Sequence, residues 1–331
     1  MRKGFYVLVF ATFLIVAFVL FQPRQLANQY VGKFVPPDKA ARLAAIGKTD
    51  HLSPELQAAF APTEQFAPIP EPGPSDWLAQ HRETGQTFEQ FMRGAPNRPN
   101  QMRHKLYMLP LGDFDSSASL ELDLLKQFAR AFFAMEVEFL PVAKLDGLPI
   151  KIRQRSDQQQ QLLTTDVLAW LEGQLPEDAY CLLAITMEDL YPQESWNFVF
   201  GQASLSQRVG VYSFARYAPE FLGRVSTPED APHTLMLSCK ILSHETGHMF
   251  GIKHCVHFHC LMNGSNHQDE SDRTPIHLCP VCLRKLQSSL GFDVKQRYES
   301  LKVFSDQVGW DEESKWLEER TEFLKNEAPG T

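Results

Sequence analysis

Apolar residues between positions 105 and 250 recur with two different periods, and these periods predict alternating strands and helices. Short apolar runs that end in turn residues predict strands, expected at 105–112, 137–142, 179–186, 197–204 and 208–215. Apolar stripes at helical spacing predict helices, expected at 117–135, 166–175 and 233–250. Residues 158–161 are polar and predict a loop. This order indicates an α/β layer that is followed along the chain by a helix ending near residue 250.

The strand expected at 179–186 reads AYCLLAIT, an apolar run without interruption. Such a run is typical of a strand covered on both faces. The last two strands are joined by a tight turn near 205–207. Beyond residue 290 the chain is helical and acidic, and we expect 311–331 to form a separate acidic helix. Its apolar side chains predict a face that docks onto the domain; they are Trp316, Leu317, Phe323 and Leu324.

The N-terminal run at 4–21 contains eighteen residues without a charge, preceded by Arg2 and Lys3. This length is just enough for a helix to cross a thin bilayer. A cleaved signal peptide is the competing interpretation, but no small-x-small cleavage site follows. We therefore expect residues 1–24 to be a single-pass membrane anchor or uncleaved signal. The basic N-terminus favours a topology with the rest of the chain outside the cytoplasm.

Proline is concentrated between residue 22 and about residue 104. The run at 66–74 cannot be helical, because each proline removes a hydrogen-bond donor and restricts the residue before it. We expect 25–74 to be a proline-rich stalk. The aromatic residues that follow, Trp77, Phe88 and Phe91, are expected to pack onto the domain, because exposed aromatic residues at that density would be costly.

The composition is that of a globular protein, with 44% hydrophobic and 22% charged residues among 331. The net charge of −8 argues against a nucleic-acid-binding protein. The informative feature is clustering: four of the six cysteines lie between residues 255 and 282, and seven of the eleven histidines lie between 244 and 277. This clustering indicates metal binding.

The string from His244 to His254 reads HETGHMFGIKH. On a helix, His244 and His248 project from one face and can bind the same zinc ion. Glu245 is then beside the open coordination position, where it can act as general base on a zinc-bound water. Gly251 can adopt positive φ, so it ends the helix and bends the chain back. The bend lets His254 approach as third ligand.

Four cysteines follow the histidines with the spacing C-x4-C…C-x-x-C: Cys255, Cys260, Cys279 and Cys282. This four-cysteine pattern predicts a closed, structural zinc site. Two disulfides are the alternative in an oxidising compartment; we favour zinc because of the Cys-x-x-Cys pair. Cys181 and Cys239 lie in apolar segments and are expected to be inert core thiols. No role is assigned to His257, His259, His267 or His277.

The motif HExxHxxGxxH resembles the extended zinc motif of the metzincin metalloproteases. The cysteine after the third histidine, the segment Cys260-Leu-Met262 and the pair Cys279-Pro-Val-Cys282 resemble the archaemetzincins. The likeness covers roughly residues 75–292. It implies a metzincin-like α/β (α+β) fold: a twisted mixed sheet, a backing helix, an active-site helix and a small, zinc-stabilised, mostly helical C-terminal subdomain. It also implies that Met262 is the Met-turn residue, an apolar floor beneath the histidines.

Residues 75–310 are thus expected to form a zinc peptidase domain that acts on a peptide or protein substrate. We expect two zinc ions per chain, one catalytic and one structural, and a monomer. The alternative is a non-catalytic zinc module that binds a protein partner through its cleft or its four-cysteine knob. Glu245 favours the enzyme, because a structural site gains nothing from a carboxylate beside an open position.

Overall fold

The computed structural model of the chain describes residues 33–114, 122–155, 159–204, 206–225, 227 and 229–327. The membrane anchor expected at 1–24 lies outside these residues, so it stays a prediction. Within the described ranges, no helix is long and apolar enough to cross a membrane.

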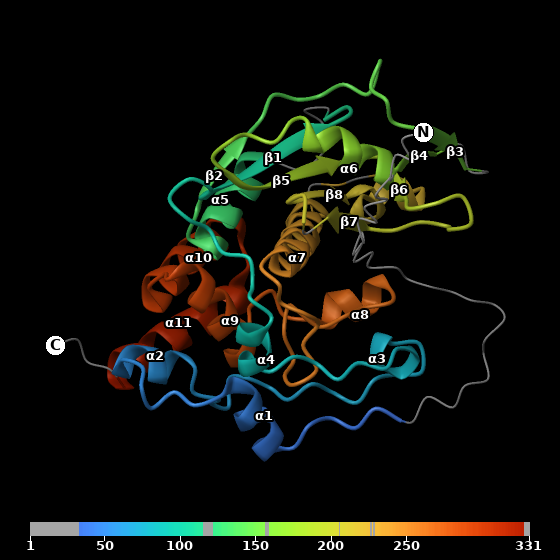
Figure 1. Cartoon of the computed structure of the whole chain (residues 1–331). Coiled ribbons are helices and arrows are strands. Elements are labelled where there is room, and N and C mark those ends of the chain that lie inside the picture. Colours follow the sequence, from blue (N-terminus) through green and yellow to red (C-terminus); the bar gives the residue numbers. More distant parts are fainter. Residues whose placement is uncertain are drawn as a thin grey trace, which may run out of the picture.

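Five strands form the main sheet, in the order β2-β1-β5-β8-β7 (Figure 1). Their bounds are β1 Lys105–Leu111, β2 Glu136–Phe139, β5 Ala179–Thr186, β7 Gly201–Ser204 and β8 Val209–Ser213. The first four in this order are parallel, and β7 pairs antiparallel with β8 at the edge. All five were expected, but β7 begins four residues late, because Val199 forms a bridge to Leu190 instead of joining β8.

The main sheet carries helices on both faces, as the uninterrupted apolar sequence of β5 predicts. Cys181 and Leu183 face the core shared with α5 (Leu122–Phe133) and α7 (Ala231–Met249). Leu182 and Ala184 face a second core shared with α6 (Thr164–Glu172). Every residue of β5 is buried. Burial of both faces holds α7, the helix that contains the histidine motif, against the sheet.

A second, small sheet was not expected. It contains β3 (Ile152–Gln154), β4 (Gln160–Leu163) and β6 (Asp189–Tyr191). The prediction of a polar loop at 158–161 is wrong from Gln160 onward. Gln161 is buried because its amide donates to the carboxylate of Asp189 at 2.7 Å, and Arg216 pairs with the same carboxylate at 2.8 Å. A buried polar side chain is tolerated when it is hydrogen-bonded.

Three helices complete the C-terminal part: α9 (Pro280–Leu290), α10 (Val294–Val308) and α11 (Asp311–Glu327). Helix α10 packs against both α5 and α11. Leu317 and Leu324 of α11 are buried, and Trp316 and Phe323 pack at the edge of the core, as expected for a docking face. The mixed sheet, its covering helices and this helical C-terminal part confirm the predicted fold class.

The described part of the expected stalk, residues 33–74, packs against the domain and contains two helices (Figure 1). Helix α1 (Lys39–Ile46) contacts α9, and α2 (Pro54–Ala59) contacts α10 and α11. Phe60 and Phe66 are almost fully buried in the main core. This part of the proline-rich segment packs onto the domain and does not stand apart as a stalk, because its apolar residues gain more from burial than from exposure to water. We call residues 33–74 the arm.

Residues 75–100 connect the arm to β1 and contain α3 (Trp77–Gln80) and α4 (Phe88–Arg93). Trp77 and Phe91 are buried, as expected from the sequence. Phe88 is half-buried, and the guanidinium of Arg284 lies over its ring at 3.9 Å. This connection runs past the turn that follows α7.

Candidate active site

The first two histidines of the motif lie one turn apart on α7. Their Nε2 atoms are 3.0 Å apart. The Nδ1 of His244 donates to the carbonyl of Leu261 at 2.8 Å, and the Nδ1 of His248 donates to the carbonyl of Ile252 at 2.6 Å. A carbonyl only accepts hydrogen bonds, so the proton is on Nδ1 and Nε2 keeps the lone pair that a metal needs.

The third histidine reaches the other two through a turn at Gly251. Helix α7 ends at Met249, and Gly251 has φ +82°, a conformation that favours glycine. His254 then lies with its ring centroid 5.3 Å from that of His244 and 5.1 Å from that of His248. Its Nδ1 hydrogen-bonds to the Oε1 of Glu83 at 2.8 Å. The predicted triad is thus assembled as the spacing implied.

The triad has the geometry of a zinc site. Candidate ligand atoms of the three histidines lie within 4.8 Å of one another. Ligand nitrogens at the usual Zn–N distance and a tetrahedral angle lie about 3.3 Å apart, close to the 3.0 Å between His244 and His248. Three neutral imidazoles would leave one position for water or substrate. The residues present therefore fit a catalytic zinc ion.

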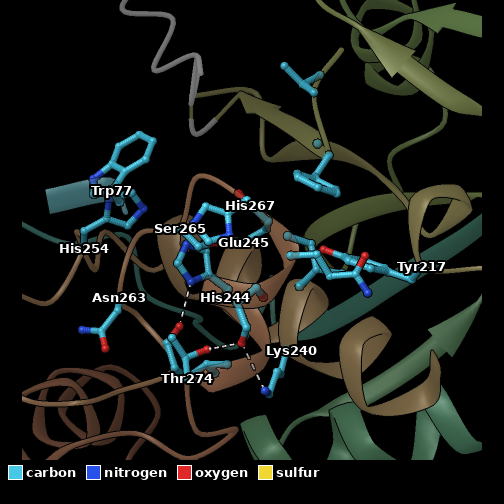
Figure 2. Close-up of a pocket in the computed structure, with 17 residues that line it drawn as sticks. Trp77, Tyr217, Lys240, His244, Glu245, His254, Asn263, Ser265, His267 and Thr274 are labelled. Atoms are coloured by element: carbon cyan, nitrogen blue, oxygen red, sulfur yellow. Dashed lines mark hydrogen bonds between the residues drawn. The ribbon is translucent and has the colours of Figure 1, made fainter. Parts of the chain in front are cut away.

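A pocket opens beside the triad, lined on one side by Trp77 and His254 and on the other by Lys240 and Tyr217 (Figure 2). Tyr217 comes from the short helix η1 (Ala215–Tyr217). Glu245 also lines this pocket, and burial raises its pKa to about 8. Glu245 thus lines the same pocket as His244 and His254.

Met262 lies directly beneath the helix that carries the first two histidines. Its Sδ would be 2.7 Å from a Cβ added to Gly247. The side chain amide of Asn263 donates to the carbonyls of Cys255 and Phe258, which holds the loop in a closed turn. This arrangement agrees with the apolar floor that the resemblance implied for Met262.

The four clustered cysteines come together below the triad. All are buried, all are free thiols, and their sulfur atoms lie within 4.8 Å of one another. The Sγ atoms of Cys255 and Cys279 are 3.6 Å apart, which is far longer than a disulfide and close to the roughly 3.8 Å between thiolates around tetrahedral zinc. The backbone N–H groups of Met262 and Cys279 point at the sulfur of Cys260. The cluster fits a closed zinc site better than two disulfides.

The remaining histidines of this region have structural surroundings. His267 hydrogen-bonds to Asp76 at 3.1 Å, and His277 hydrogen-bonds to Glu313 at 2.8 Å. His257 is buried and makes no hydrogen bond to other described residues, and His259 lies near His277. Cys181 and Cys239 are fully buried, outside the cysteine cluster, as expected of core thiols.

Asp76, His267 and Glu270 form a third group with metal-ligand spacing. Its carboxylates already accept hydrogen bonds from the chain: Glu270 from the backbone of Trp77 and of Asn266, and Asp76 from Arg273. These bonds connect α3 to α8 (Gln268–Arg273), so the group has a structural role.

Sequence reasoning missed four residues of the site: Glu83 and Trp77 from the connection before β1, and Lys240 and Tyr217 in the pocket. Lys240 is one turn before His244 on α7, so helical periodicity could have found it. Glu83 belongs to no motif and is 171 residues away from its partner His254. Only the fold brings these two residues together.

A mixed sheet resting on a helix that bears two of three clustered histidines is the arrangement of a metallopeptidase. Comparison with known proteins gives the family. The family model for peptidase family M54 matches residues 163–288, which include the histidine triad and all four clustered cysteines. Archaemetzincin-2 of Rattus norvegicus is 39% identical in an alignment of 280 residues, and the match covers 76% of this chain and 78% of that protein. The chain therefore belongs to the archaemetzincins, the M54 family of metallopeptidases.

Two further matches are weaker. Human Archaemetzincin-1 is 32% identical in an alignment of 261 residues, and the match covers 70% of this chain and 52% of that protein. Among solved structures, archaemetzincin from Methanopyrus kandleri is 28% identical with a TM-score of 0.44, covering 59% of this chain and 99% of that chain.

Proposed function

We propose that the protein hydrolyses peptide bonds with a catalytic zinc ion held by His244, His248 and His254. The observation that carries the proposal is the position of Glu245. It is the one carboxylate among the described residues that line the pocket, and two of the histidines line the same pocket. Three histidines with an open fourth position are typical of catalytic zinc, whereas structural zinc is fully enclosed by protein ligands.

The residues of the chain divide the work of hydrolysis. The carbonyls of Leu261 and Ile252 hold two imidazoles with Nε2 directed inward, and Glu83 does the same for His254. Zinc bound there supplies Lewis-acid chemistry, lowering the pKa of a water to about 7 and polarising the substrate carbonyl. Glu245 accepts the proton of the attacking water and passes it to the nitrogen of the leaving amine.

We also infer that Cys255, Cys260, Cys279 and Cys282 hold a second zinc ion with a structural role. Four thiolates fill a tetrahedral shell and leave no position for substrate. All four side chains are at most 2% exposed. Side chains buried this deeply offer little surface to a protein partner. The burial therefore argues against the alternative function, in which the protein binds a partner through the four-cysteine site.

The proposal is tested with the full chain loaded with zinc and a random peptide library. We expect cleavage that a chelator abolishes. In Glu245→Gln the zinc content should be unchanged, while the cleavage rate falls by roughly 10²–10⁴-fold through loss of the general base. Glu299→Gln, at an exposed site on α10, is the matched control and should cleave normally. Equal rates in Glu245→Gln and wild type, or no cleavage by the wild type, would contradict the proposal.

A further inference from the structure

Lys240 is a buried cation inside the candidate active site. It lies on α7 one turn before His244, lines the same pocket as His244 and Glu245, and is only 8% exposed (Figure 2). Its Nζ donates to the backbone carbonyls of Ser271 at 3.2 Å and of Asp272 at 3.1 Å. An ammonium has three N–H donors, so these two bonds leave one for another partner.

Among the described residues, no carboxylate forms a direct ion pair with Lys240; Asp272 and Glu313 act on it only from a longer distance, and Glu313 is paired with His277 at 2.8 Å. The carboxylate of Asp272 is instead 3.7 Å from the Nε2 of His233. Glu245 is the one acidic residue lining the pocket, and the mechanism uses it beside the triad. Neutral carbonyls satisfy hydrogen bonds but do not neutralise a charge, and a buried charge is costly unless it is paired.

The position of Lys240 suits a group carried by the substrate. An α-helix rises about 1.5 Å per residue, so the turn from Lys240 to His244 spans about 6 Å along the axis of α7. An extended acidic side chain on a residue next to the scissile bond bridges a distance of that order. The C-terminal carboxylate of a short peptide also falls within this range.

We propose that Lys240 is a specificity-determining residue that binds a carboxylate of the substrate, so that the enzyme prefers peptides with an acidic group beside the scissile bond. The substrate carboxylate supplies a direct ion-pair partner and accepts the remaining N–H of the ammonium. A charge-assisted hydrogen bond of this kind is stronger than a neutral one. The inference rests on the proposed function, because it takes the pocket beside Glu245 as the substrate site.

Binding tests this inference without relying on turnover. The full chain carrying Glu245→Gln and loaded with zinc is immobilised, so that captured peptides stay intact. It is exposed to two random N-acetylated hexapeptide pools, one with a free C-terminus and one amidated. We expect enrichment of Glu or Asp over Gln or Asn by about tenfold in the amidated pool, the ratio typical of one charge-assisted hydrogen bond. Stronger capture of the free-acid pool than of the amidated pool, without enrichment of Glu or Asp in either, would instead identify the C-terminal carboxylate as the ligand.

Two further substitutions, each made in the Glu245→Gln chain, separate the effect of the Lys240 charge from the effect of its hydrogen bonds within the protein. Lys240→Met removes the donors and the charge, whereas Lys240→Gln retains an amide that can still donate to the carbonyls of Ser271 and Asp272. Both should lose the acidic preference in both pools. Lys295→Met, at an exposed position on α10, should keep it. If Lys240→Met fails to fold, Lys240→Gln alone decides the question.

Two outcomes overturn the inference: no enrichment of acidic peptides or free carboxylates in either pool, or an enrichment that persists in Lys240→Gln. Failure of the proposed function is distinct from both, because it would appear as absence of cleavage by the protein with Glu245 intact. Peptides cleaved without any acidic preference would refute the role of Lys240 alone.

Discussion

Glu83 illustrates how a single residue outside every motif completes the metal centre. Its carboxylate accepts the Nδ1 hydrogen of His254 and leaves the Nε2 lone pair facing the other two histidines. His254 is otherwise enclosed by the indole of Trp77, whose ring is perpendicular to the imidazole at 5.2 Å. The matched family region, 163–288, includes neither Glu83 nor Trp77. Both come from the connection before β1.

Glu83→Gln is expected to lower the affinity of the histidine site for zinc by about 10–100-fold, the range typical of outer-shell carboxylates. An amide holds the imidazole less firmly and leaves it less basic. The measurement is competition with a zinc chelator of known affinity, followed by metal analysis. Glu64→Gln, at an exposed position in the arm, is the control and should bind zinc like wild type. Unchanged affinity in Glu83→Gln would show that the contact does not orient the ligand.

The residues of the site differ in how far the sequence could predict them. His244, Glu245 and His248 follow from helical spacing, and His254 follows from the turn that Gly251 permits, so purely local rules suffice for these four. The partners of Glu83 and Gln86 are not local. Gln86 hydrogen-bonds to Gly251, 165 residues away, and to Lys285, 199 residues away. No pattern along the chain specifies such pairs, because they depend on how the elements pack.

At the scale of elements, uniform apolar patterns were predictable and short polar ones were not. The buried strand β5 was predicted with the observed bounds. Strand β4 was missed because its glutamines look like loop residues until Asp189 is present to pair with Gln161. Helices α1 and α2 were hidden by the proline-rich composition, although Asp38 and Ser53 cap their first turns. Those capping residues were a usable signal.

The cysteine cluster supports the loop that carries Met262 and leads into α9. Cys282→Ser should therefore lower the zinc content by about one ion and speed amide hydrogen exchange across residues 255–290, because metal binding at such sites contributes directly to folding. Cys239→Ser changes a thiol outside the cluster and serves as the control, with the full zinc content expected. Full zinc content in Cys282→Ser would rule out a four-cysteine site.

At the scale of the whole molecule, the arm ties the beginning of the described chain to its end. The ring of Phe66 packs edge-on against the ring of Trp316, with 5.7 Å between the ring centroids. The guanidinium of Arg320 lies over the ring of Phe66, 4.6 Å from its centroid. We expect Phe66→Ala to lower the free energy of unfolding by about 3–5 kcal/mol, as for other large core truncations. Urea unfolding measures this change. Val35→Ala is the control: Val35 is 76% exposed, so the effect should be small. A small effect in both variants would mean that the arm is loosely attached.

The membrane anchor expected at 1–24 and the monomeric state remain predictions. The full chain should sediment with membranes, whereas a chain beginning at residue 30 should stay in the supernatant, because the apolar run at 4–21 is then absent. Fractionation followed by N-terminal sequencing measures both points. A mature protein that begins between residues 20 and 35 would show that a signal peptide is cleaved. Light scattering of the shortened chain should give the mass of one copy.

The packing of the arm also determines when the protein can finish folding. Thr63 hydrogen-bonds to Arg320 across 257 residues of chain. At the usual speed of synthesis, the ribosome needs roughly 13–50 s to make the intervening segment. During that interval Phe66 lacks the indole of Trp316 and the guanidinium of Arg320 that pack on it in the folded protein, and contacts this distant in sequence form slowly. A nascent chain that stops before α11 would thus expose the arm to chaperones and proteases, even though every proposed zinc ligand had already been translated.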